Sequence, residues 1–151
     1  NEKMVEAVLR ARKPVVIMHM KGTPRDMQKN PHYEDVVSEI KSFFEERIKI
    51  LKNENFEDII IDPGIGFGKT LEHNIAIIKN MKTFKSLGYP VMFGPSRKSF
   101  IGMISGEKEP KKRVSGTIAS CLYCYEWVDI FRVHDVYEMN QAFSVFEKLI
   151  G

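Results

Sequence analysis

One segment of the chain combines a carboxylate, several glycines and a lysine directly after a short apolar run. The run is Ile59-Ile60-Ile61, and the segment reads Asp62-Pro63-Gly64-Ile65-Gly66-Phe67-Gly68-Lys69-Thr70. A β-branched run that ends in an acid and breaks into glycines is typical of a buried strand that leads into a loop. Loops at the carboxyl ends of parallel strands hold the ligands of α/β proteins. The segment therefore indicates a binding site whose first charged residue is Asp62.

These glycines do not complete either of the two common nucleotide-binding patterns. A Walker loop needs a glycine five residues before its Gly-Lys-Thr end, and that position is Pro63. The dinucleotide fingerprint needs glycine at its first, third and sixth places, and the sixth place is Lys69. Both patterns fail at one residue. A tight strand-to-helix turn without a ligand remains an alternative from these residues alone.

Three further apolar runs also end in polar or glycine-rich residues. The run 14–20 contains His19 and Met20, the run 90–94 leads into Ser96-Arg97-Lys98-Ser99, and the run 129–134 contains Arg132 and His134. His19 could instead be a hydrogen-bonded core histidine, and the Arg97-Lys98 pair a solvated turn.

Arg132 lies within an apolar run, where a buried guanidinium without a partner is costly. His134 stands two residues further on, so both side chains leave a strand on the same face. Such a pair is a candidate binding site for an oxyanion or a phosphate.

Asp62 is expected at the same edge of the sheet as this pair. The pattern therefore predicts a site with one carboxylate and several cations. The carboxylate suits a heterocycle with N–H donors, and the cations suit a phosphate or pyrophosphate leaving group. No persuasive Ser/His/Asp arrangement or metal-ligand cluster is present, which disfavours hydrolase and redox-metal chemistry.

The elements that must position these residues alternate between strands and helices. Continuous apolar runs at 14–20, 58–61, 90–94 and 129–134 predict strands that are covered on both faces. Helices are predicted after them, the first capped by Asn30 with Pro31 at its first position. The others are expected near residues 71–84, 99–101, 110–127 and 136–149. Alternating strands and helices predict a parallel sheet. Four such units are half of a (β/α)₈ barrel, which needs about 250 residues; a small doubly wound sheet is the structural alternative.

Composition places the chain among ordinary globular proteins. It has 151 residues, 43% of them hydrophobic, and a net charge of +3, which fits one domain with a substantial core. No dense basic block predicts nucleic-acid binding, no run reaches the length of a membrane span, and the first residues do not resemble a secretory signal. Cys121 and Cys124 are the only cysteines, which favours a reducing, cytoplasmic setting. Their helical surroundings favour buried thiols over a redox or zinc site.

Several motifs, taken together, are specific to one family. They are Met18-His19-Met20-Lys21-Gly22-Thr23-Pro24, Met27-Gln28, Asp62 through Thr70 with Glu72-His73-Asn74, Ser96-Arg97-Lys98-Ser99-Phe100-Ile101-Gly102, Ser115-Gly116-Thr117, and Arg132-Val133-His134-Asp135-Val136. With them the chain resembles the dihydropteroate synthase family of folate biosynthesis, a target of sulfonamides. The resemblance implies a TIM barrel, of which residues 1–151 are a pterin-binding domain forming the C-terminal half. It also implies condensation of a dihydropterin-methyl pyrophosphate with p-aminobenzoate.

The resemblance assigns roles to individual residues. Asp62 would accept hydrogen bonds from the pterin ring, Lys98 would contact the pterin and position p-aminobenzoate, and Arg132 would pack over the pterin. These three are the implied catalytic residues. Arg132 and His134 would hold phosphate oxygens, and Ser99 would lie at the aminobenzoate end. The residues expected to line the pterin pocket are Met18, Gly66, Phe67 and Gly94. His19 is expected to be structural.

The resemblance further implies Mg²⁺, a homodimer and a requirement for the N-terminal half of the barrel, which would carry the Mg²⁺ ligand. No metal ligand is expected in this chain, and the chain alone is expected to be inactive. The family usually has a glycine before the last strand, where this chain has Glu126-Trp127-Val128. Two alternatives remain. A methyltransferase module that presents methyltetrahydrofolate to a corrinoid protein would share Asp62, but would have no reason to keep Arg132 and His134. A noncatalytic half-barrel that binds or assembles is the other.

Overall fold

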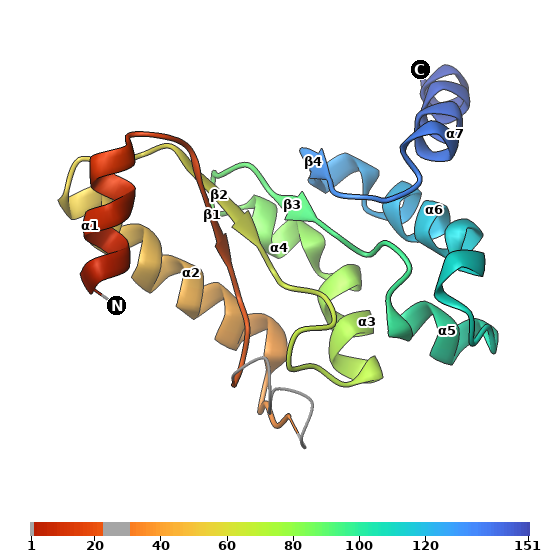
Figure 1. The fold of residues 1–151 in the computed structure, drawn as a ribbon, viewed down its shortest axis with the longest axis horizontal. Helices are drawn as coiled ribbons and strands as arrows, with labels where there is room; N and C mark the ends of the chain where they lie inside the picture. The colour runs from red at the N-terminus through yellow and green to blue at the C-terminus, as the bar shows by residue number, and fades with distance from the viewer. Residues whose placement is uncertain (1, 23–30) are drawn as a thin grey trace.

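The computed structural model describes residues 2–22 and 31–151, and within them four parallel strands lie in chain order. The strands are β1 (Val15–Met18), β2 (Ile59–Asp62), β3 (Met92–Phe93) and β4 (Ile130–Phe131). β1 pairs with β2, β3 pairs with β4, and a parallel bridge between Ile61 and Val91 joins the two pairs. The order β1-β2-β3-β4 has no reversal, so the sheet is part of a barrel and not a doubly wound sheet (Figure 1).

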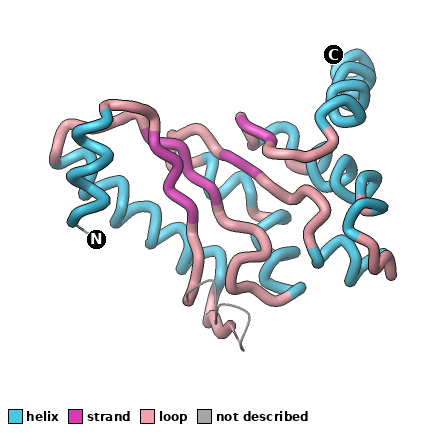
Figure 2. Tube along the Cα trace, viewed as in Figure 1, coloured by secondary structure: helices cyan, strands magenta, loops and turns pink. Residues whose placement is uncertain are grey.

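Helices connect the strands, as the alternation predicts. They are α1 (Glu2–Ala11), α2 (Val36–Asn53), α3 (Leu71–Lys79), α4 (Met81–Lys85), α5 (Ser99–Ser105), α6 (Val114–Tyr123) and α7 (Val136–Ile150), with 3₁₀ turns at Pro110–Lys112 and Tyr125–Trp127. Figure 2 shows the strands side by side, with helices following each of them. α1 has no counterpart among the predicted elements. No helix in the described part of the chain is both long and apolar enough to cross a membrane.

Three helix boundaries differ from the prediction. α2 begins at Val36, and its N-cap is Asp35, whose Oδ1 accepts hydrogen bonds from two backbone N–H groups of the first turn. Pro31 is therefore not helical, and Asn30 lies outside the described residues. The helix predicted at 71–84 is interrupted at Asn80, and the helix predicted at 110–127 is an α-helix flanked by two 3₁₀ turns.

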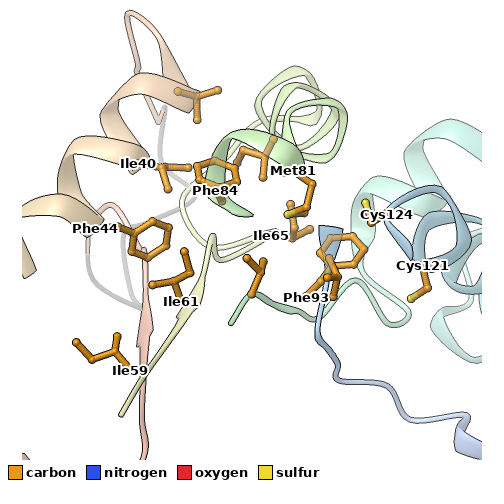
Figure 3. Packing of buried hydrophobic residues seen from close by; sticks show 14 of the residues in the cluster. Ile40, Phe44, Ile59, Ile61, Ile65, Met81, Phe84, Phe93, Cys121 and Cys124 are labelled. Carbon is orange, nitrogen blue, oxygen red and sulfur yellow. The ribbon is translucent and has the colours of Figure 1, made fainter. Parts of the chain in front are cut away.

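The core lies between the strands and the helices. Ile61 of β2, Phe93 of β3 and Val91 just before β3 are fully buried. Phe44 of α2 and Phe84 of α4 belong to the same core, with their ring centroids 6.0 Å apart in an edge-to-face arrangement (Figure 3). Truncating a buried phenylalanine of this kind costs about 3–5 kcal/mol. This packing fixes the strands, and hence the positions at which their loops begin.

The two cysteines belong to this core. Cys121 of α6 and Cys124 at its C-terminal cap are free thiols with no exposed surface. Burial raises the pKa of each thiol to about 12, and each is therefore protonated at neutral pH. The prediction that both cysteines are buried is confirmed, and Cys121 is helical as expected, whereas Cys124 lies just beyond the helix.

The outer strands offer open backbone edges. In the described part of the chain, β1 pairs only with β2 and β4 only with β3. Val16 of β1 is 39% exposed, and apolar side chains of α7 such as Tyr137 and Leu149 are more than 75% exposed. Unpaired edges next to exposed apolar groups are templates for association.

We therefore expect the 151-residue chain on its own to self-associate and to be poorly soluble. In the complete barrel, meaning this chain joined to the N-terminal half that the resemblance implies, four further strands would close both edges. Sedimentation velocity on the two proteins at equal concentration tests this. A chain that stays monomeric by itself would contradict the expectation.

Candidate functional site

The loops that follow the strands bring a carboxylate and two cations together. Asp62 is the last residue of β2, Lys98 follows β3, and Arg132 follows β4. The Nη2 of Arg132 lies 3.7 Å from Oδ2 of Asp62. The side chain of Lys98 is close enough to influence the ionisation of the same carboxylate. The grouping expected from the sequence, with one carboxylate and several cations at one sheet edge, is present in the structure.

The Asp62 carboxylate is buried and only partly satisfied by the protein. The residue is 2% exposed, and Oδ1 accepts a hydrogen bond of 2.8 Å from the backbone N–H of Gly64. Burial raises the pKa of the carboxyl group, and the Gly64 N–H, Lys98 and Arg132 oppose that rise. Oδ2 faces Arg132 from beyond hydrogen-bond distance, so it can accept N–H donors from a ligand.

Lys98 lies along the glycine-rich loop that follows β2. Its ammonium donates a hydrogen bond to the carbonyl of Ile65 and sits 4.4 Å from the centre of the Phe67 ring. Gly66 has φ of +81°, and a Cβ on it would lie 3.2 Å from Cδ of Lys98. Burial lowers the pKa of Lys98 to about 8, although Asp62 opposes the shift. The predicted residues Gly66, Phe67 and Lys98 thus lie next to one another.

Arg132 reaches Asp62 by passing over Gly94. A Cβ on Gly94 would lie 3.3 Å from Nε and 3.4 Å from Nη2 of Arg132, so a larger residue there would displace the guanidinium. This guanidinium is not buried in a strand, contrary to the prediction from the sequence. β4 ends at Phe131, and the Arg132 side chain is 59% exposed. Its exposure leaves the group accessible to an anionic ligand.

His134 is held through Ser96, which is 7% exposed. The Ser96 hydroxyl accepts a hydrogen bond of 3.1 Å from the backbone N–H of His134 and lies 2.8 Å from Nδ1 of its ring. When the hydroxyl donates to Nδ1, the proton of the neutral ring is on Nε2. The exposed side of this imidazole is then an N–H donor beside the strand end that carries Arg132.

The remaining predicted residues surround this cluster. Met18 is the last residue of β1, half-buried, and in register with Asp62. Ser99 is the first residue of α5 and is exposed. Arg97 is not part of the cluster, and it is not a free solvated group either. Its guanidinium pairs through Nε and Nη2 with Asp135, which ties the loop after β3 to the start of α7.

The sequence analysis did not single out Lys69 as a site residue. Lys69 is 4% exposed and contacts His19, which is also buried, as expected for a structural histidine. Burial lowers the pKa of His19 to about 4, so its ring is neutral and can accept a hydrogen bond. A buried lysine is unusual, but its burial is visible only in the structure; the sequence offers only the position of Lys69 within a glycine-rich loop.

Comparison with known proteins gives one consistent family. Residues 1–134 match the family described as pterin binding enzyme. The chain is 42% identical over 139 residues to the dihydropteroate synthase of Synechocystis sp., covering 90% of this chain and 48% of that protein. It is 37% identical over 150 residues to the Escherichia coli dihydropteroate synthase, covering 97% of this chain and 53% of that protein. The chain thus spans about half the length of these relatives.

Solved structures agree with the sequence relatives. A dihydropteroate synthase from Thermus thermophilus in complex with 4-aminobenzoate has 38% identity and a TM-score of 0.94, over 100% of this chain and 62% of that one. The Xanthomonas albilineans dihydropteroate synthase in complex with 7,8-dihydropteroate has 35% identity and a TM-score of 0.90. The match covers 99% of this chain and 55% of that one. The expected half of a barrel is confirmed.

The loop geometry predicts that Gly64 tolerates no side chain. Gly64 has φ of +69°, and a Cβ on it would lie 1.9 Å from the carbonyl oxygen of His19. Gly106→Ala is a matched control, because Gly106 has φ of +79° and nothing within 4 Å of the added Cβ. The left-handed conformation alone costs alanine about 1–2 kcal/mol. We expect Gly64→Ala in the complete barrel to cost at least about 2 kcal/mol more than the control, measured by urea unfolding. Equal losses of stability in the two variants would show that the close contact between Gly64 and the His19 carbonyl is unimportant.

Proposed function

The chain belongs to the pterin-binding enzyme family, and from this premise we propose that it is the C-terminal half of a dihydropteroate synthase. The reaction condenses (7,8-dihydropterin-6-yl)methyl diphosphate with 4-aminobenzoate, giving 7,8-dihydropteroate and diphosphate. The observation that carries the proposal is the buried Asp62 carboxylate, 3.7 Å from Arg132 and within the influence of Lys98. One carboxylate and two cations suit a substrate with ring N–H donors at one end and a diphosphate at the other.

The buried and apolar groups around Asp62 are proposed to contact the pterin. Asp62 accepts N–H bonds from the heterocycle through Oδ2. The Phe67 ring and the stem of Lys98 offer a flat apolar surface beside it, and Gly94 keeps the approach open beneath Arg132. Met18, half-buried at the end of β1 and in register with Asp62, is proposed to contact the same ring. A buried carboxylate that is short of donors binds such a ring more strongly than an exposed one would.

At the diphosphate end, charge is arranged for departure of an anion. The C–O bond breaks and its electron pair leaves with the diphosphate, while the electron-rich pterin stabilises the methylene cation that remains. Asp62 favours this cation, and Arg132 with the Nε2–H of His134 favours the leaving anion. The amine nitrogen of 4-aminobenzoate then forms the new C–N bond and loses a proton. Ser99 follows Lys98 and is exposed, and we propose that it contacts the aminobenzoate.

Mg²⁺ and a homodimer are also proposed on the resemblance, with the Mg²⁺ ligand expected in the N-terminal half of the barrel. Among the described residues there is no group of three or more His, Cys, Asp or Glu that could hold a metal ion. The acid at the site, Asp62, already has Lys98, Arg132 and Lys69 near it, and these positive charges disfavour a metal ion beside it. No step is therefore assigned to a metal here. A cytoplasmic location is proposed on the two free, buried cysteines.

Pyrophosphate release tests the proposal. The complete barrel is supplied with the pterin diphosphate, with and without 4-aminobenzoate, and phosphate is counted after pyrophosphatase treatment. We expect release that requires 4-aminobenzoate and is matched by dihydropteroate formation. Methyl transfer from methyltetrahydrofolate to a corrinoid without such release would indicate the methyltransferase alternative. Binding without any turnover would indicate a noncatalytic piece.

Asp62→Asn should weaken pterin binding more than 4-aminobenzoate binding. A charge-assisted hydrogen bond contributes about 1.5–3 kcal/mol, which corresponds to roughly ten- to a hundredfold in affinity. Asp58→Asn is the control, since Asp58 is exposed and lies directly before the start of the same strand. Isothermal calorimetry of the complete barrel with each ligand gives the comparison. Equal losses for the two ligands would count against Asp62 facing the pterin.

Arg132→Lys should be damaging although the charge is kept. Lysine lacks the planar guanidinium that can pass over Gly94 and bind oxyanions in pairs. We expect the affinity for inorganic pyrophosphate to fall by about tenfold or more, and the affinity for a pterin without phosphates to fall less. Arg10→Lys, on the exposed face of α1, is the control. An unchanged pyrophosphate affinity would remove Arg132 from the proposed leaving-group end.

A further inference from the structure

Lys69 is a buried cation that the proposed reaction does not use. Its ammonium lies 2.8 Å from the carbonyl oxygen of Gly64, 3.0 Å from that of Phe67 and 3.3 Å from that of His19. It also lies 3.1 Å from Nδ1 of the His19 ring. An ammonium has three N–H donors, so these four acceptors use its full capacity. Lys69 thus connects the loop after β2 with the end of β1.

The shape of that loop explains why a cation is needed there. Gly64, Gly66 and Gly68 have φ of +69°, +81° and +65°, and in this loop the carbonyls of Gly64 and Phe67 both point at the Lys69 ammonium. Gly64 also packs so closely against the His19 carbonyl that no side chain fits between them. Converging carbonyl dipoles in a buried place are unfavourable without a donor. Lys69 supplies the donors from within the loop.

The outer side of the same loop carries the groups that face the site. The backbone N–H of Gly64 bonds Oδ1 of Asp62, the Ile65 carbonyl accepts from Lys98, and the Phe67 ring lies under that ammonium. Gly64 and Phe67 therefore each take part in two interactions. The carbonyls of both residues accept hydrogen bonds from Lys69. The N–H of Gly64 also donates to Asp62, and the ring of Phe67 also contacts Lys98. If Lys69 were lost and the loop moved, the contacts of the loop with both Asp62 and Lys98 would therefore change.

We propose that Lys69 is a positioning residue for pterin binding, whose ammonium holds residues 64–67 against the end of β1 and so sets Asp62, Phe67 and Lys98. This inference rests on the proposed function, because it assigns the pterin to that side of the loop. It separates two lysines by role. Lys98 faces the ligand, whereas Lys69 acts without touching it, through the backbone of the loop and through its charge near Asp62.

The protonation of Lys69 makes this role dependent on pH. The charged and titratable groups facing it are Asp62 of β2, Lys98 after β3 and His19 after β1. Burial lowers the pKa of Lys69 to about 7, although Asp62 opposes the shift. A neutral amine has two N–H donors, so one acceptor loses its partner as the pH rises through this pKa. Positioning by Lys69 should therefore weaken above neutral pH.

The test uses Lys69→Met in the complete barrel, since methionine keeps an unbranched stem and removes the donors. Lys82→Met, at an exposed position on α4, is the matched control. Calorimetry measures the affinities for a pterin without phosphates and for inorganic pyrophosphate. We expect Lys69→Met to lose roughly tenfold or more in pterin affinity and less than about threefold in pyrophosphate affinity. The control should change neither.

A pH series separates positioning from a general loss of stability. Between about pH 6 and about pH 9 the pterin affinity of the unmodified barrel should fall more than that of Lys69→Met, because only the former has this group to deprotonate. Lys98 is present in both proteins, so the difference between the two profiles reports the loss of Lys69, including its effect on Lys98. Parallel profiles, an unchanged pterin affinity, or equal losses for both ligands would overturn the inference.

Hydrogen exchange distinguishes failure of this inference from failure of the proposed function. The amides of Gly66 and Phe67 should exchange at least about tenfold faster in Lys69→Met without any ligand present. If the unmodified barrel bound no pterin, the proposed function would fail and the pterin role of Lys69 with it. The exchange rates would then still show whether Lys69 holds the loop.

Discussion

The site depends on the burial of one carboxylate. Asp62 is 2% exposed, and a carboxylate so placed is tolerated only with donors and cations around it. The Gly64 N–H, Lys98, Arg132 and Lys69 all favour its ionised form, and they come from three loops. The parallel order of the strands is what allows this, because it places the ends of β2, β3 and β4 next to each other. Glycines at 64, 66 and 94 then leave room for the cations to approach.

The sequence predicts the scaffold and the carboxylate well, for a physical reason. Buried parallel strands must be apolar throughout, so four short runs locate the sheet, and a charged residue at the end of one stands out. The apolar run predicts a buried Arg132, and this is wrong because the end of a strand cannot be located to one residue from sequence. Asn30 with Pro31 and Asp35 both fit the start of a helix, and only the structure shows that Asp35 is the N-cap. Lys69 was missed because its partners are mostly backbone carbonyls, and no pattern of side chains records where these point. The ligand contacts assigned to the predicted residues stay predictions.

The two ends of the site differ in how complete they are within this chain. Asp62, Lys69 and the stem of Lys98 are enclosed by the loop after β2, so their interactions are strong without any further chain. Arg132 and His134 are exposed, so water weakens their attraction for an anion. A bound diphosphate, or the barrel half beyond β1 and β4, would have to exclude that water. The surroundings of Asp62, where we propose that the pterin binds, are thus the part of the site that this half of the barrel organises by itself.

Burial also couples ionisation to ligand binding. Between about pH 7 and the ordinary lysine pKa of 10.5, Lys69 and Lys98 bind fewer protons when folded than when unfolded, so the cost of burying them falls as the pH rises through that window. Asp62 has a raised pKa, so its burial opposes folding once the pH exceeds the ordinary value of a carboxyl group. At neutral pH the ionised cluster is therefore held at some cost in stability. Ring N–H donors at Asp62 and an anion near Lys98 would each offset part of that cost. The same desolvation that destabilises the empty cluster thus adds to the affinity for a ligand with both features.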